Sequence, residues 1–190
     1  MIPAIILTLS VILFRVVMGF NDIATNFSPV AAIVLCSAVF LPLRIALPLA
    51  FGSLFVSDLL LNAHYGVGLS LAFFVKYAAF ALIFGLGYWL RQNPKFSLKG
   101  IFGTTIAAAL LFYVITNTMS WATDPAYAKS LGGWFQALTI GNPAFATPTW
   151  MFFRNSLAGN LFFTGLFVLL VKPDLFRIRS RSAGTIPAAQ

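Results

Sequence analysis

Three cationic residues interrupt otherwise apolar stretches of the sequence: Arg15, Lys76 and Arg154. A charge in hydrocarbon is costly, so such residues tend to face the interior of a helix bundle or water, and to pair with an anion. Guanidinium and ammonium groups bind carboxylates and phosphates. The three cations therefore predict a ligand that carries one of these anions.

Each cation also has a structural alternative. Arg15 and Arg154 lie near the ends of their apolar stretches, from which a long side chain can reach the membrane surface. Lys76 is predicted to lie roughly 13 Å from the nearer end of its stretch, which is too deep for that. Asp58 is its candidate partner in a purely structural ion pair. The sequence leaves both alternatives open for each cation.

Residues 19–32 form the first polar interruption of the chain and contain Asp22 and Asn26. The stretch ends in a helix start, because Ser28 can cap a helix and Pro29 suits its first position. A polar loop between two apolar helices is either a plain connector or the lid of a site. We predict a lid that contributes Asp22 and Asn26.

The sequence lacks the motifs of the common enzyme classes. It has no Gly-x-Ser-x-Gly, no His-Glu-x-x-His and no P-loop, so the chain alone cannot be an ATPase. It has no Glu, and His64 and Cys36 are its only histidine and cysteine. These residues leave few candidates for acid–base catalysis and too few ligands for a zinc site. The chain is predicted not to be an enzyme and to hold no cofactor or metal.

The composition predicts an all-α, polytopic membrane protein. Of the 190 residues, 60% are hydrophobic and 8% are charged, whereas about 25% are charged in a soluble domain. The mean hydropathy is +0.93. The first apolar stretch lacks a positive start and an Ala-x-Ala site, so it is predicted to be a spanning helix rather than a cleaved signal.

Six apolar segments are candidates for the roughly 20 residues that a spanning helix needs. Pro42 and Pro48 shorten the second and third, so these two are predicted either to cross or to form a hairpin that does not fully cross. The six segments comprise residues 2–20, about 29–41, about 43–61, 67–90, 101–120 and about 149–171.

The charged loops predict that both termini are cytoplasmic, in the inner membrane of a bacterium. With the N-terminus inside, Lys129 is the one basic loop residue outside, and the inner side holds eight. Residues 1–172 are predicted to form one domain, and residues 173–190 a basic, disordered tail. Despite the net charge of +8, the expected partner is the lipid bilayer and not nucleic acid. The inner basic residues are Arg44, Arg91, Lys95, Lys99, Lys172, Arg177, Arg179 and Arg181.

This predicted order of membrane crossings places the polar residues in the outer half of the bundle. It therefore predicts an outward-facing cavity rather than a through-pore. Asp58, Asn117 and Asn160 all fall there. Amides in membranes also often bond only to neighbouring helices, and Asn117 and Asn160 suit that role equally well. Residues 126–138 have apolar residues at helical spacing, which predicts a helix lying flat on the outer surface.

Four motifs resemble an uncharacterised bacterial family of candidate transport proteins, similar to the substrate-binding S components of energy-coupling-factor (ECF) transporters. The motifs comprise Asn26-Phe27-Ser28-Pro29-Val30-Ala31-Ala32, Ser57-Asp58-Leu59-Leu60, Thr116-Asn117 followed by Trp121, and Asn155-Ser156-Leu157-Ala158-Gly159-Asn160.

The resemblance implies a six-helix bundle with both termini cytoplasmic and a first outer loop that closes over a small-molecule site. It also implies a partner, a transmembrane coupling protein with two ATPases. In S components, small residues four apart on the first helix serve this docking, and Ala4 and Thr8 are the nearest equivalent here. Substrates of such proteins are vitamins or metal ions, and a neutral residue at Asn160 argues against a metal ion.

The sequence thus predicts a subunit that binds a vitamin-like or anionic small molecule for uptake. The alternative is a membrane scaffold or assembly subunit that transports nothing and whose polar residues only join helices. The predicted ligand-binding residues are Arg15, Asp22, Asn26, Asp58, Lys76, Asn117, Arg154 and Asn160.

Overall fold

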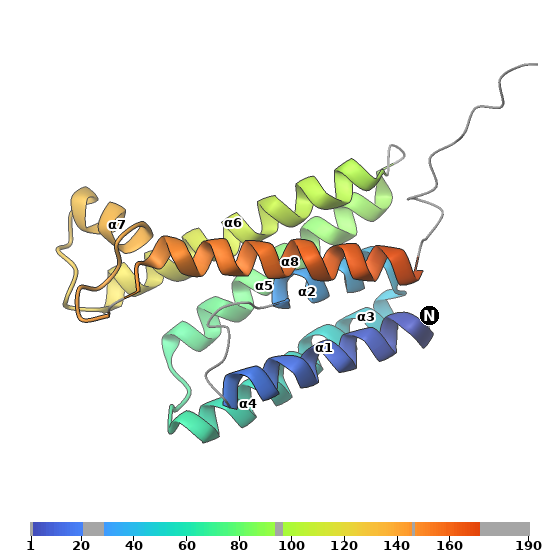
Figure 1. Cartoon of the computed structure of the whole chain (residues 1–190), viewed down its shortest axis with the longest axis horizontal. Coiled ribbons are helices and arrows are strands. Elements are labelled where there is room, and N and C mark those ends of the chain that lie inside the picture. Colours follow the sequence, from blue (N-terminus) through green and yellow to red (C-terminus); the bar gives the residue numbers. More distant parts are fainter. Residues whose placement is uncertain (1, 21–28, 94–96, 146, 172–190) are drawn as a thin grey trace, which may run out of the picture.

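The computed structural model describes residues 2–20, 29–93, 97–145 and 147–171, and these residues are helical with short connections (Figure 1). No strand occurs in these ranges. The elements are α1 (Ile2–Phe20), α2 (Val30–Phe40), α3 (Leu43–Leu47), the π-helix η1 (Pro48–Gly52), α4 (Ser53–Tyr65), α5 (Leu71–Gln92), α6 (Leu98–Thr123), α7 (Leu131–Leu138) and α8 (Thr149–Val171).

Five helices of the described chain are long and apolar enough to cross a membrane, which indicates a multi-pass membrane protein. They are α1, the continuous helix formed by α3, η1 and α4, and helices α5, α6 and α8. The predicted bounds of the first and sixth segments agree with α1 and α8. Large apolar side chains such as Ile2 and Leu13 are exposed on the outside of the bundle, as lipid contact requires.

The third predicted segment is long enough to cross, although a proline lies within it. Leu43–Tyr65 is one helix of 23 residues. Pro48 lacks an N–H and would clash with the preceding turn of an α-helix, and a π-helical turn begins at this residue. The hydroxyl of Ser53 donates to the carbonyl oxygen of Ala50 over 3.3 Å, within this irregular turn.

The second predicted segment is the short one, so the described chain contains five helices of spanning length rather than six. Helix α2 has 11 residues, or about 17 Å, against a hydrocarbon core of about 30 Å. Pro29 precedes it, and Leu41 ends it in an extended conformation because Pro42 follows.

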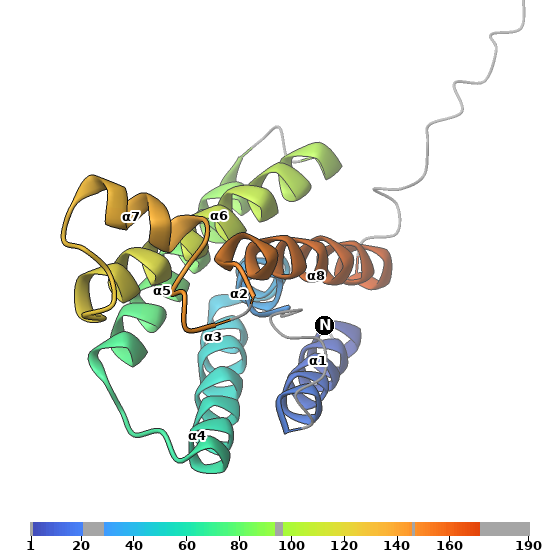
Figure 2. The same ribbon diagram turned by 60° about the vertical axis from the view of Figure 1, so that its left-hand side comes forward.

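Helix α2 lies in the middle of the bundle and is its core. Ten of its residues, Val30–Val39, are buried. It packs against α5 and α8, with α6 beyond, while α1 lies at the edge beside α4 (Figures 1 and 2). Gly87 of α5 allows the closest approach, because a Cβ atom there would lie 2.6 Å from the carbonyl oxygen of Leu35.

Side chains from neighbouring helices cap both ends of α2. The N–H of Ala32, in its first turn, donates to Asn160 Oδ1 of α8 over 2.7 Å. Arg91 Nη1 of α5 donates to the carbonyl oxygen of Leu41 over 2.7 Å at the other end. Helix ends leave backbone groups without partners, and these are costly away from water. The Asn160 cap explains how a helix of 11 residues can begin inside the bundle, and the exposed Arg91 satisfies its other end beside α3.

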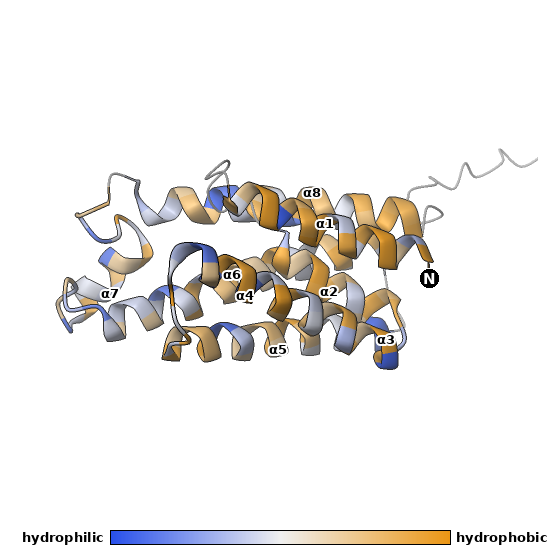
Figure 3. Ribbon diagram, turned by 90° about the horizontal axis from the view of Figure 1, so that it is seen from below, coloured by the Kyte–Doolittle hydropathy of each residue, from blue (hydrophilic) through white to orange (hydrophobic). Residues whose placement is uncertain are grey.

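The bundle has two ends, and α7 marks one of them (Figure 1). At the end that carries α7, helices α1, α4 and α6 finish and helices α5 and α8 begin (Figure 1). Hydrophobic residues cover most of the long helices, and hydrophilic residues concentrate near loops and helix ends, as at α3 (Figure 3). The α7 end is the one that the loop charges predict to be outside. The predicted surface helix within residues 126–138 is present there as α7, over Leu131–Leu138.

Candidate functional site

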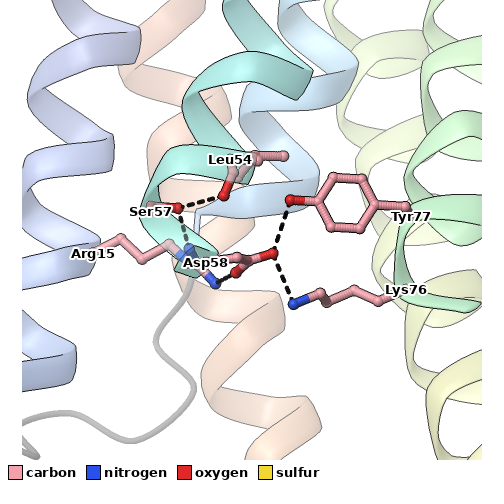
Figure 4. Close-up of polar contacts among 6 residues, drawn as sticks. All are labelled: Arg15, Leu54, Ser57, Asp58, Lys76 and Tyr77. Atoms are coloured by element: carbon pink, nitrogen blue, oxygen red, sulfur yellow. Dashed lines mark hydrogen bonds and ion pairs between the residues drawn. The ribbon is translucent and has the colours of Figure 1, made fainter. Parts of the chain in front are cut away.

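Helices α1, α4 and α5 bring two of the predicted cations to a single carboxylate (Figure 4). Arg15 Nη2 lies 2.6 Å from Asp58 Oδ1, and Lys76 Nζ lies 2.7 Å from Asp58 Oδ2. The hydroxyl of Tyr77 donates to Asp58 Oδ2 over 3.0 Å. Arg15 Nη1 also donates to the hydroxyl of Ser57. These five residues, Arg15, Ser57, Asp58, Lys76 and Tyr77, are called the Asp58 cluster below.

The helix bounds explain why these residues meet. Helix α5 begins at Leu71, four residues later than residue 67, where the fourth segment is predicted to begin. Lys76 is therefore about 7.5 Å from the helix start, not 13 Å. Arg15 is equally far from the end of α1 at Phe20, and Asp58 is about 10.5 Å from the end of α4 at Tyr65. The cluster thus joins three helices at similar depths below the α7 end.

The Asp58 carboxylate is well satisfied. Its side chain is 3% exposed, and burying a carboxylate costs several kcal/mol unless it is paired. Three donors from two other helices reach its two oxygens. The structural ion pair that the sequence allowed for Lys76 is therefore present, and Arg15 turns inward to the same acid.

The two cations exceed the one anion of the cluster by one positive charge. The Lys76 side chain is 25% exposed and that of Arg15 is 18% exposed. The Lys76 ammonium lies 5.1 Å from the centre of the Phe73 ring and 5.7 Å from that of Tyr77. Aromatic faces attract a cation and help to hold it where it is not fully hydrated. An ammonium has three donors, and the Asp58 pair uses one of them.

A cavity of about 200 Å³ lies beside the cluster. It is called the central cavity below. Arg15, Lys76, Ser156 and Asn160 give it a polar side. The aromatic rings of Phe80 and Phe112 stack at 5.1 Å with an angle of 4° between their planes and form part of its apolar wall. Val30, Ala31 and Ala109 complete the lining.

Two further cavities adjoin the central one through shared lining residues. One, of about 270 Å³, contains Lys76 and Thr116 in its lining, together with Asn62, Ser70 and Ser120. The other, of about 160 Å³, contains Thr116, Asn117 and Ser156. The polar residues of the α7 end thus line neighbouring hollows as well as helix contacts.

The two predicted amides have different surroundings. Asn160 is 2% exposed and is bonded on both sides: its Oδ1 accepts from Ala32, and its Nδ2 donates to the carbonyl oxygen of Ser156 over 2.8 Å. It lines the central cavity, but its polar atoms hold helices together. Asn117 Nδ2 donates to the carbonyl oxygen of Tyr113 in its own helix, and the residue lines the third cavity.

The remaining predicted residues do not join the cluster. Arg154 is exposed on α8, and its guanidinium lies 5.6 Å from the centre of the Trp150 ring. This placement agrees with the alternative in which Arg154 extends to the membrane surface. Asp22 and Asn26, the two predicted contributions of the lid, lie outside the described residues.

Tyr77 and Ser57 are members of the cluster that the sequence reasoning missed. A tyrosine within an apolar span needs a partner for its hydroxyl, and Asp58 is the one acid within the spans, so the pair could have been found. Ser57 lies next to Asp58 in α4, and its hydroxyl also donates to the carbonyl oxygen of Leu54 over 2.8 Å. The described residues contain no group of metal ligands, and Cys36 is buried in α2.

Residues 1–174 match the model of a family of unknown function, DUF6580. No curated protein matches the chain. No solved structure matches it either. Since the match covers nearly the whole sequence, the chain belongs to the DUF6580 family.

Proposed function

We propose that this DUF6580 protein is the substrate-binding subunit of an uptake transporter in the cytoplasmic membrane of a bacterium. Its fold is proposed to be that of an S component of the ECF type, with both termini cytoplasmic. The substrate is a vitamin-like or anionic small molecule that enters from the α7 end and binds in the central cavity. The loop that contains Asp22 and Asn26 is proposed to cover it.

The observation that carries the proposal is the meeting of Arg15 and Lys76 beside a cavity. Ionisable residues in spanning helices are costly and usually mark a substrate or ion pathway. If the two cations served only to neutralise Asp58, one of them would be enough, yet two from different helices are present. The surplus positive charge lines a hollow of about 200 Å³, which suits an anionic ligand.

The short helix α2 supports the same proposal. Transporters often build substrate sites from helices that begin or end inside the membrane. The first residues of α2, Val30 and Ala31, line the central cavity. The N-terminal end of a helix carries a partial positive charge and adds to the attraction for an anion.

The sequence contains no nucleotide-binding motif, so the energy for transport would come from a partner or from an ion gradient. We propose a transmembrane coupling protein with two ATPases. Ala4 and Thr8, the small residues that resemble a docking pair, are both fully buried, and Thr8 donates to the carbonyl oxygen of Ala4. The proposed docking must therefore use another surface, such as the exposed face of α1 that contains Ile6 and Leu13.

Native mass spectrometry of the protein, extracted gently from its own membrane, tests the proposal. We expect a bound small molecule that is lost in Lys76→Met. Lys129→Met is the matched control, because Lys129 is a lysine of the α7 end that does not line the central cavity. A mass without ligand in the wild-type protein, with membrane proteins bound instead, would overturn the proposal.

The scaffold function remains the second candidate, and the Asn160 contacts favour it. Both polar ends of this amide are bonded within the chain, as expected of a residue that only joins helices. A scaffold needs no lid. Deleting residues 22–26 should then leave assembly and growth unchanged, whereas a binding subunit should lose uptake.

A further inference from the structure

We infer that the central cavity takes a monocarboxylate whose body is about as large as one six-membered ring, with its carboxylate on Lys76. This inference rests on the proposed function and specifies its substrate class. It depends on the charge of the lining, on the donors that remain available there, and on the size and shape of the hollow.

The charge of the lining indicates a single negative charge on the ligand. Arg15 and Lys76 both line the cavity, and no described acid does. Asp58 neutralises one of the two cations from behind. One positive charge therefore remains on the lining, and a partly buried cation is stabilised by one opposite charge. A dianion would leave a negative charge without a partner, and a cation would be repelled.

Lys76 is the cation that can bind the ligand, because Arg15 is already needed to hold two helices together. Arg15 bonds to both Ser57 and Asp58 and thereby links α1 to α4. The Lys76 ammonium can keep its bond to Asp58 Oδ2 and direct its two other donors at a ligand, while Arg15 stays on Oδ1. Lys76 also lines the neighbouring cavity of about 270 Å³.

The walls of the cavity indicate a flat, apolar body. Phe80 and Phe112 stack on each other, and the parts of their rings that line the cavity offer an apolar surface against which an aromatic ligand can pack. Ser156 lies on the polar side, and its hydroxyl accepts from Asn160 Nδ2 over 3.2 Å, which leaves its own hydrogen available to a ligand. A cavity of about 150 Å³ is known to hold benzene. The central cavity, at about 200 Å³, has room for a ring and a carboxylate.

Three probes of equal size and different charge test this inference: benzoate, benzamide and benzylamine. Their binding to the full-length, ligand-free protein is measured by calorimetry in lipid nanodiscs. We expect benzoate to bind roughly tenfold to a hundredfold more tightly than benzamide, as a hydrogen-bonded charge predicts, and benzylamine to bind least. Equal binding of benzoate and benzamide, or tighter binding of benzylamine, would overturn the inference.

Variants then test whether Lys76 supplies the positive charge that binds the carboxylate. Lys76→Met should reduce benzoate binding to the level of benzamide, Lys76→Arg should keep much of the preference, and Lys129→Met should behave as wild type. Unchanged benzoate binding in Lys76→Met would overturn the role of Lys76. The comparison of probes on the wild-type protein needs no variant, so it holds even if Lys76→Met fails to fold.

The same preparation separates this inference from the proposed function. If none of the probes binds but native mass spectrometry finds another small molecule, the substrate class is wrong and the binding subunit stands. If none binds and no small molecule is found, both fail.

Discussion

The Asp58 cluster and the cap of α2 by Asn160 border the same cavity, yet they use their polar groups differently. The Asn160 amide is bonded within the chain on both sides and carries no charge. The Asp58 cluster holds one more cation than anion, and its Lys76 ammonium has donors left beside a hollow. Polar residues in a membrane thus become candidates for ligand binding when they have donors or acceptors that no neighbour uses.

Removing the charge of Asp58 should have the largest effect, because it leaves two cations of the bundle without a partner. In Asp58→Asn, the amide is nearly the same size, so the loss is electrostatic. We expect the free energy of unfolding to fall by about 3–5 kcal/mol, the usual result of breaking a buried ion pair. Thermal unfolding in detergent measures the change.

Asp124→Asn is the control for this change. Asp124 follows α6 at the α7 end, where it accepts from the N–H of Ala126 over 2.8 Å and from Asn142 Nδ2 over 3.1 Å. It has no described ion pair, and we expect a loss of less than about 1 kcal/mol. An Asp58→Asn loss no larger than this would show that the cluster contributes little to stability.

Asn160→Ala should be next in effect and should act on stability rather than on binding. The change leaves the N–H of Ala32 without its acceptor, so we expect a loss of about 1–2 kcal/mol, as for other lost helix caps. Asn160→Asp keeps the acceptor and should retain more of the stability. Benzoate affinity, measured by calorimetry, should change less than about threefold in Asn160→Ala. A tenfold loss of affinity with unchanged stability would reverse the contrast with the Asp58 cluster.

Much of the fold could be predicted because apolar length is a local property. The bounds of α1 and α8 follow directly from the run of apolar residues, as do those of α5 and α6 to within a few residues. The path around Pro48 could not be predicted, because a proline can end a helix or be absorbed in a π-helical turn, and the surroundings decide which.

The candidate site was predictable in part. The sequence allowed an ion pair between Lys76 and Asp58 as a structural alternative, and the pair is present. The inward turn of Arg15 depends on the rotation of α1 about its axis, which neighbouring helices set. The role of Asn160 could not be predicted either, because its partner Ala32 is 128 residues away in the sequence and only the packing of α2 against α8 brings the two together. Arg15 and Arg154 looked alike by sequence and differ only because one faces α4 and the other is exposed.

Tyr77→Phe should have the smallest effect. It separates the residues of the cluster that stabilise Asp58 from those that bind the ligand. It removes one donor from Asp58, which keeps Arg15 and Lys76, so we expect a stability loss of about 1 kcal/mol. Tyr88→Phe, an exposed position on the same helix, is the control and should cost almost nothing. Benzoate affinity should stay within about twofold of wild type, because Tyr77 does not line the central cavity. A clear loss of affinity at unchanged stability would instead place Tyr77 among the residues that hold the ligand. Tyr77 and Lys76 would then both bind it, and Asp58 would support them both.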